Sequence, residues 1–307
     1  MNHLSFYWLP DNKEALLQSI ESEFSELIAH SVSTGKITLP PISEVVLRIQ
    51  KLCTQECTEI IDIADCLLED PGLAAIVIRV ANSVIFNRRN ITCTDLFTAV
   101  SRLGILRVRD IVTAQAIEQL KHTVSLSKEC NRVLVKSATT SRELAATMVM
   151  VAKAFKEERP KTYRYLEVEK ALLSGLIADI GLFCMVNEYH QYLENGNYLD
   201  LQIALQIFDS QCSDSSKLVL TSWGFDQDFI SVATNQNHDP KSDVPLSYLE
   251  LARIANHILL FRRKDEDIDD HFVEFDTTGA DVLYKLTNLS ELDFNTQISE
   301  VINSSGL

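Results

Sequence analysis

Apolar residues recur at helical spacing along most of the chain, with charged residues on the opposite side. The first such segment, residues 11–33, places Leu16, Ile20 and Phe24 on one face, as in an amphipathic helix. The same pattern predicts further helices over residues 45–52, 61–68, 71–84, 94–103, 106–120, 138–155, 166–186, 198–209, 213–222, 226–236, 244–263, 278–287 and 290–303. The segment 166–186 is apolar nearly all round, which indicates a buried helix.

Several helix ends carry their own signals. Asp70 followed by Pro71 predicts a helix start, with the carboxylate as N-cap and proline at the first helical position. Thr58 offers a second N-cap, and Gly35 and Gly104 are expected to end helices.

Composition favours the same fold class. The 307 residues are 46% hydrophobic and 23% charged, with only 9 Gly and 7 Pro. These values are ordinary for a globular protein and leave few residues for tight turns. We therefore expect an all-α protein of long helices joined by short links.

The charge disfavours two classes of partner. The formal net charge is −15, and residues 265–307 hold eleven acids and one base. The field of an acidic protein repels phosphate backbones and anionic membranes, so we expect neither a nucleic acid nor a membrane as partner. The acidic run at 265–270 is expected to be a solvated linker.

Seven cysteines at irregular spacing, with no C-x-x-C pair, predict reduced thiols and a cytoplasmic location. The N-terminus does not resemble a signal peptide, and no uncharged apolar run has the roughly 18 residues of a membrane span. Phosphate-loop, H-E-x-x-H and G-x-S-x-G motifs are missing, and no two histidines lie within one turn of a predicted helix. The sequence therefore suggests no cofactor.

Four motif blocks carry a family resemblance. They are Leu39–Val45, Glu69–Leu73, Val80–Ser83 and Arg102–Arg109. In order and separation they resemble the HDOD domain (HD-related output domain), a bacterial all-helical module similar to the metal-dependent HD phosphohydrolases. The resemblance spans about residues 37–240 and implies an HD-like helical bundle. It leaves an N-terminal helical extension over 1–36 and a smaller C-terminal helical region over 241–307.

The resemblance also indicates where HD phosphohydrolases hold their metal with His and Asp. Lys136 stands at the position of the first His, and Ala178 replaces the His of the His-Asp pair while Asp179 remains. Cys212 falls at the next His position, and His238 retains a His at the last one. Two scattered ligands do not make a tight divalent site. We therefore expect a lost metal site; the alternative is a phosphohydrolase with a divergent site.

Asp179 lies in an apolar segment, where a carboxylate is costly to bury without a partner. One hypothesis is an ion pair with Lys136 in the space that the metal left. The alternative is that backbone or hydroxyl groups donate hydrogen bonds to Asp179.

Residues 79–109 form a basic stretch with six arginines and one acid. Its polar residues give a candidate interaction surface of Arg79, Asn82, Arg88, Arg89, Arg102, Arg107 and Arg109. Arg79 and Asn82, three apart on one helix, are expected to be neighbours. Arginine binds carboxylates and phosphates in bidentate geometry, so this surface would suit an acidic partner or a nucleotide. The alternative is internal pairing with acids such as Asp110.

The resemblance and the missing ligands together predict a non-catalytic regulatory module in bacterial signal transduction. It would bind another signalling protein or a small ligand such as a nucleotide. The sequence leaves the identity of the partner and the oligomeric state open.

Overall fold

The computed structural model describes residues 23–37, 42–87, 90–123, 126–236, 246–265 and 277–305, together with 268 and 273. Every regular element of more than one residue in these ranges is an α-helix, which confirms the all-α class. The helices are α2 Glu23–Ser33, α3 Glu44–Cys53, α4 Ile60–Leu68, α5 Pro71–Asn82, α6 Leu96–Leu103, α7 Ile105–Thr123, α8 Lys128–Glu158, α9 Val168–Ile177, α10 Ile180–Glu194, α11 Leu201–Ser222, α12 Gln227–Thr234, α13 Tyr248–Arg263, α14 Thr277–Thr287 and α15 Glu291–Ser305.

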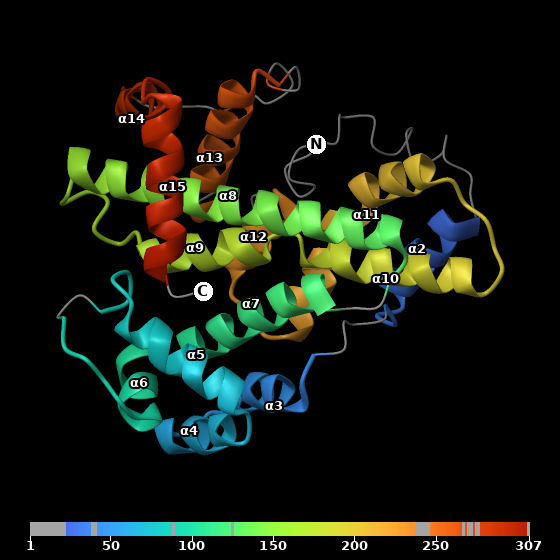
Figure 1. Cartoon of the computed structure of the whole chain (residues 1–307), viewed down its shortest axis with the longest axis horizontal. Helices are drawn as coiled ribbons and strands as arrows, with labels where there is room; N and C mark the ends of the chain where they lie inside the picture. Colours follow the sequence, from blue (N-terminus) through green and yellow to red (C-terminus); the bar gives the residue numbers. More distant parts are fainter. Residues whose placement is uncertain are drawn as a thin grey trace.

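The long helix α8 organises the molecule. Helices α9, α10, α13, α14 and α15 all pack against it, and α2 packs against α10 and α11. Helices α3 to α7 pack on one another in a second group, which lies below α8 and α9 in Figure 1. Helix α7 joins the two groups because it contacts α3, α5 and α6 on one side and α8 and α9 on the other. One apolar core runs through both groups.

The helix ends follow from local chemistry. Asp70 accepts hydrogen bonds from the N–H groups of Gly72 at 3.0 Å and Leu73 at 3.1 Å, and Pro71 is the first helical residue, as predicted. Gly104 ends α6 with φ +85°, a conformation that costs a residue without a Cβ little. The prediction for Thr58 was wrong: Glu59 is the N-cap of α4 and its N–H donates to Asp62.

Two predicted helix boundaries are corrected by the structure. The segment 166–186 is not one helix, because the chain leaves helical geometry at Asp179, with φ −105° and ψ 28°, between α9 and α10. The two helices predicted over 198–209 and 213–222 are instead one helix, α11, which begins at Leu201. Its serine-rich middle looked like a break in the sequence, but Ser210, Ser213 and Ser216 are buried against neighbouring helices.

The segment Val168–Glu194 is long and apolar enough to cross a membrane by length and composition. However, 83% of its apolar window is buried inside the fold. Its hydropathy is therefore explained by the core position of α9 and α10.

Some expectations fall on residues outside the described ranges. These are the first half of the helix over 11–33, most of the acidic run at 265–270, and the side chains of Arg88, Arg89 and His238.

Candidate functional site

Asp179, the retained member of the His-Asp pair, lies between α9 and α10 and is 2% exposed. The hydroxyl of Ser141 in α8 donates to its Oδ1 at 3.0 Å, and the hydroxyl of Ser137 donates to its Oδ2. Both carboxylate oxygens are thus bonded by α8. These bonds satisfy a charge that would otherwise be costly to bury.

Lys136 does not take part in this arrangement. Its side chain is exposed on α8, although its neighbour Ser137 reaches Asp179. Consecutive residues of a helix point in directions about 100° apart, so Ser137 and Lys136 cannot both face α9. The hydroxyl alternative for Asp179 is confirmed, and the ion-pair hypothesis was wrong.

The remaining positions of this group are buried among close-packed helices. Ala178 and Cys212 are both fully buried, and the thiol of Cys212 lies 3.9 Å from the hydroxyl of Ser216. Burial raises the pKa of the Cys212 thiol, and the nearby Asp179 raises it further. The thiol is therefore protonated at neutral pH and would have to release its proton to bind a metal ion.

Helices α10 and α11 leave no room beside Cys212. A Cβ added at Gly181 would lie 2.5 Å from both the carbonyl oxygen of Cys212 and the backbone nitrogen of Ser216. The N–H of Gly181 donates to the Ser216 hydroxyl at 3.0 Å. The space between these helices is filled by protein.

The described residues of this group, which do not include His238, do not fit a catalytic metal centre. Ala178 has no donor atom, Lys136 points outward, and Asp179 is already bonded by two hydroxyl groups. In the part of the chain that the structure describes, no group of three or more His, Cys, Asp or Glu side chains is placed to hold a metal ion.

Three of the four described arginines of the basic stretch are paired internally. Arg102 donates to the carbonyl of Ala81 at 2.9 Å and to Asn82 Oδ1 at 3.3 Å. Asn82 also exchanges two hydrogen bonds with the backbone of Cys93. Arg79 is exposed on the same helix, while the side chain of Asn82 is engaged by Arg102 and Cys93.

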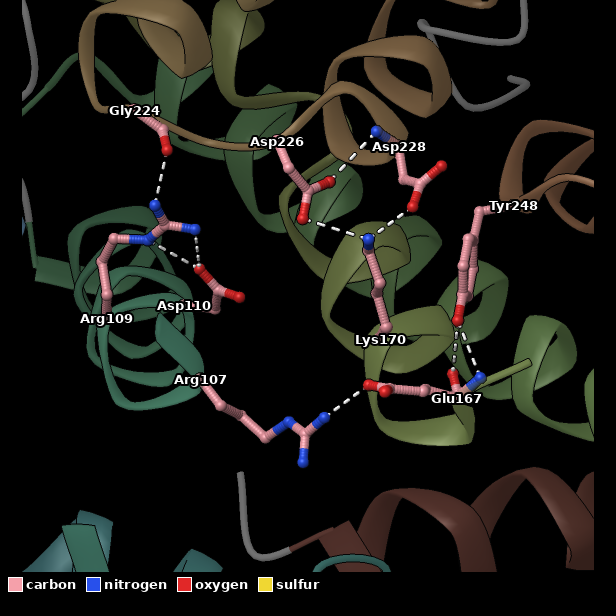
Figure 2. A network of polar contacts seen from close by, with 9 residues as sticks. All are labelled: Arg107, Arg109, Asp110, Glu167, Lys170, Gly224, Asp226, Asp228 and Tyr248. Carbon is pink, nitrogen blue, oxygen red and sulfur yellow. Dashed lines mark hydrogen bonds and ion pairs between the residues drawn. The ribbon is translucent and has the colours of Figure 1, made fainter. Parts of the chain in front are cut away.

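Arg109 is 3% exposed and lies inside the molecule. It makes two hydrogen bonds to Asp110 Oδ1, one to the carbonyl of Gly224, and a cation–π contact with Phe225 at 4.4 Å. Arg107 instead pairs with Glu167 at the start of α9. Figure 2 shows these two arginines leaving α7 in different directions, toward different parts of the fold. Arg107 and Arg109 therefore do not belong to one surface patch, and Arg88 and Arg89 lie outside the described residues.

Lys170 is the centre of a second set of contacts in Figure 2, between α9 and the start of α12. Its ammonium group pairs with Asp226 at 3.0 Å and with Asp228. It also lies 5.2 Å from the ring centre of Tyr248, whose hydroxyl accepts a hydrogen bond from the N–H of Glu167 at 2.7 Å. These contacts tie α9 to α12 and α13.

Asp110 is the titratable group between these two sets of contacts. Burial raises its pKa to about 6, although the Arg109 guanidinium opposes the shift, and Asp226 raises the pKa slightly while Lys170 lowers it. The junction between α7 and the α11–α12 turn thus contains a carboxyl group that titrates in mildly acidic solution.

Four residues that hold these two clusters together are not among the residues predicted from the sequence. Ser137 and Ser141 bond Asp179, and Glu167 and Lys170 pair with Arg107 and with Asp226 and Asp228. Ser137 and Ser141 carried a usable signal, because two hydroxyl residues four apart lie on the same helix face. Glu167 and Lys170 carried none, because their partners are 60 and 58 residues away along the chain.

The comparisons with known proteins agree with this fold. A family model described as the HDOD domain matches residues 39–240, which confirms the resemblance seen in the motif blocks. A Shewanella amazonensis protein, provisionally named a metal-dependent phosphohydrolase, is 21% identical over 96% of this chain and 99% of its own, with a TM-score of 0.67. An HDOD domain protein of unknown function from Geobacter sulfurreducens is 18% identical over 92% and 96%, with a TM-score of 0.48. No curated protein matches the chain.

Proposed function

We propose that this chain, which belongs to the HDOD family, is a non-catalytic regulatory module of bacterial signal transduction. It acts by binding another signalling protein, and it has lost the metal centre of the HD phosphohydrolases.

The observation that carries this proposal is the bonding of Asp179. In a metal centre this carboxylate would bind the ion, whereas here each of its oxygens accepts a hydrogen bond from a serine hydroxyl, of Ser137 or of Ser141. The adjacent residue that would bring the second ligand is Ala178, which has no donor. Serine hydroxyls give the buried carboxylate the partners that a metal would otherwise supply.

The thiols support a reducing compartment, and we place the protein in the cytoplasm. All seven cysteines are free, and five of them are buried. Burial raises the pKa of Cys53 to about 11 and that of Cys184 to about 12, so these two thiols are unreactive at neutral pH.

The test is hydrolysis of bis(p-nitrophenyl) phosphate by the full chain with Mn²⁺, Fe²⁺, Zn²⁺ or Ni²⁺ supplied. We expect no release of nitrophenolate above the metal-only blank. Turnover that disappears in Asp179→Ala but remains in Asp65→Ala, a change at an exposed aspartate of α4, would refute the loss of catalysis.

A further inference from the structure

A large hollow opens between the two helix groups. Its volume is about 690 Å³, which is in the range of pockets that hold small organic ligands. One side is formed by the segment after α5 and by α6, and the other by the end of α8 and the turn that leads into α9. In Figure 1 these elements lie at the same end of the molecule, α5 and α6 below and α8 and α9 above.

The hollow is lined by more cations than anions. The cations are Arg102, Arg107, Lys156 and Arg164, and the anions are Glu167 and Glu169. Glu169 is almost fully buried, and Glu167 is engaged by Arg107. This positive lining stands out in a chain whose net charge is −15.

Two of the cations are positioned by hydrogen bonds that leave other N–H groups of the same side chain free to donate. Lys156 donates one hydrogen bond, of 2.8 Å, to the carbonyl of Leu166, and an ammonium group has three donors. Arg102 donates from Nη1 to Ala81 and Asn82, and its other nitrogens have no hydrogen bond to any described residue. Arg164 is exposed, and its guanidinium has no partner among the described residues.

The hollow is also lined by uncharged polar and aromatic groups. Thr98 and Ser101 of α6 bring two exposed hydroxyl groups, and Phe86 and Tyr165 bring aromatic rings. Tyr165 is fixed in place, because its hydroxyl donates to the carbonyl of Leu246 at 2.7 Å and accepts from the Leu246 N–H at 2.9 Å.

We propose that this hollow binds a small phosphorylated ligand, with Arg102, Lys156 and Arg164 contacting its phosphate groups. Guanidinium and ammonium groups around a concave site are the usual partners of phosphate oxygens. The hollow shares no lining residue with the Asp179 cluster, so this inference goes beyond the proposed function and does not depend on the loss of the metal.

Occupancy of the hollow would be coupled to the arrangement of the two helix groups. Arg107 in α7 and Glu167 at the start of α9 form an ion pair at its edge. A bound phosphate competes with Glu167 for the Arg107 guanidinium. Binding therefore weakens a contact that joins the α3–α7 group to α9, which is how a ligand signal would reach a partner protein.

The test is isothermal titration calorimetry of the full chain with inorganic pyrophosphate and with ATP, both without divalent metal. We expect saturable binding of at least one probe, weakened about tenfold or more in Arg164→Glu. Glu167→Gln should bind the same probe several-fold more tightly, because it removes the competing carboxylate. A merely structural role for these residues would not move the two variants in opposite directions.

Arg132→Glu is the matched control, because Arg132 is an exposed arginine near the other end of α8. It should bind like the unchanged protein. The proposal is overturned if neither probe binds saturably at up to about 5 mM, or if Arg164→Glu and Arg132→Glu have the same affinity. Both outcomes are independent of metal content and of phosphodiester hydrolysis, which test the proposed function.

Discussion

The hydroxyl of Ser141 in α8 donates a 3.0 Å hydrogen bond to Oδ1 of Asp179, at the point where α9 ends and α10 begins. Ser137, one turn earlier in α8, bonds the other carboxylate oxygen. The carboxylate therefore joins three helices through bonds to hydroxyl groups, where HD phosphohydrolases would use a metal ion.

Removing both hydroxyl groups tests this role. Ser137→Ala combined with Ser141→Ala should lower the free energy of unfolding by about 2–4 kcal/mol, because a buried carboxylate loses its partners. Urea denaturation at pH 7 followed by circular dichroism measures the change. Thr139→Ala, at an exposed position of the same helix, should change stability by less than about 0.5 kcal/mol. Equal stability of the two proteins would contradict the assignment.

Close contact between α8 and α9 predicts a second effect. A Cβ added at Gly175 would lie 2.6 Å from the Cα of Ala145, so the two backbones would have to move apart. Gly175→Ala should lower the unfolding free energy by about 1–3 kcal/mol. In Gly72→Ala the added carbon meets only a carboxylate oxygen of Asp70, at 3.2 Å. If Gly175→Ala were no more destabilising than Gly72→Ala in thermal denaturation, the packing would be looser than described.

The sequence predicted those parts of the fold that depend on local chemistry. The start of α5 at Asp70 and Pro71 and the end of α6 at Gly104 follow from capping and from backbone freedom, which neighbouring residues decide. The motif blocks placed the chain in its family for the same reason, because each block is contiguous in sequence.

The Thr58 error was local, because Glu59 is the N-cap and its N–H donates to Asp62, but the other failures involve contacts between distant segments. The break at Asp179 was missed because an apolar stretch with one carboxylate looks like a continuous helix until the serines of α8 are in place. The opposite error occurred in α11, where buried serines look like a loop in the sequence. The alternative of internal pairing is confirmed for Arg109 and Asp110, but the bond from Arg109 to the Gly224 carbonyl could not be predicted, because Gly224 lies 115 residues away.

The raised pKa of Asp110 predicts a pH dependence. Its pKa is about 6 in the folded protein, above the ordinary value of 3.8, so the folded state holds this proton at higher pH than the unfolded chain does. Stability should therefore fall as the pH rises from about 4 to 6, by about 1–3 kcal/mol, and then level off.

Asp110→Asn removes this contribution. The difference in unfolding free energy between the unchanged protein and Asp110→Asn should decline across pH 4–6, measured by urea denaturation at each pH. Asp65→Asn, at an exposed aspartate, should show a constant difference over the same range. If the difference in unfolding free energy for Asp110→Asn is also constant over this range, the pKa of Asp110 is not raised in the folded protein.

Lys170 should contribute more than a surface ion pair. Lys170→Met breaks its pairs with Asp226 and Asp228 and should cost about 1–2 kcal/mol, because the lysine is mostly shielded from water. Lys285→Met, which breaks a solvent-exposed pair with Glu157, should cost less than about 1 kcal/mol. Thermal denaturation at low and high salt measures the stability of both variants. An equal loss of stability in Lys170→Met and Lys285→Met would show that the Lys170 pairs are not shielded from water.

The metal content of the purified chain tests the central claim most directly. The full chain is produced with manganese, iron, zinc and nickel supplied, purified without chelator or affinity tag, and examined by elemental analysis. Because Asp179 is bonded by Ser137 and Ser141, Ala178 has no donor atom and Lys136 is exposed, we expect well below a tenth of an equivalent of any transition metal. Close to one equivalent, lost in Asp179→Ala, would contradict the account.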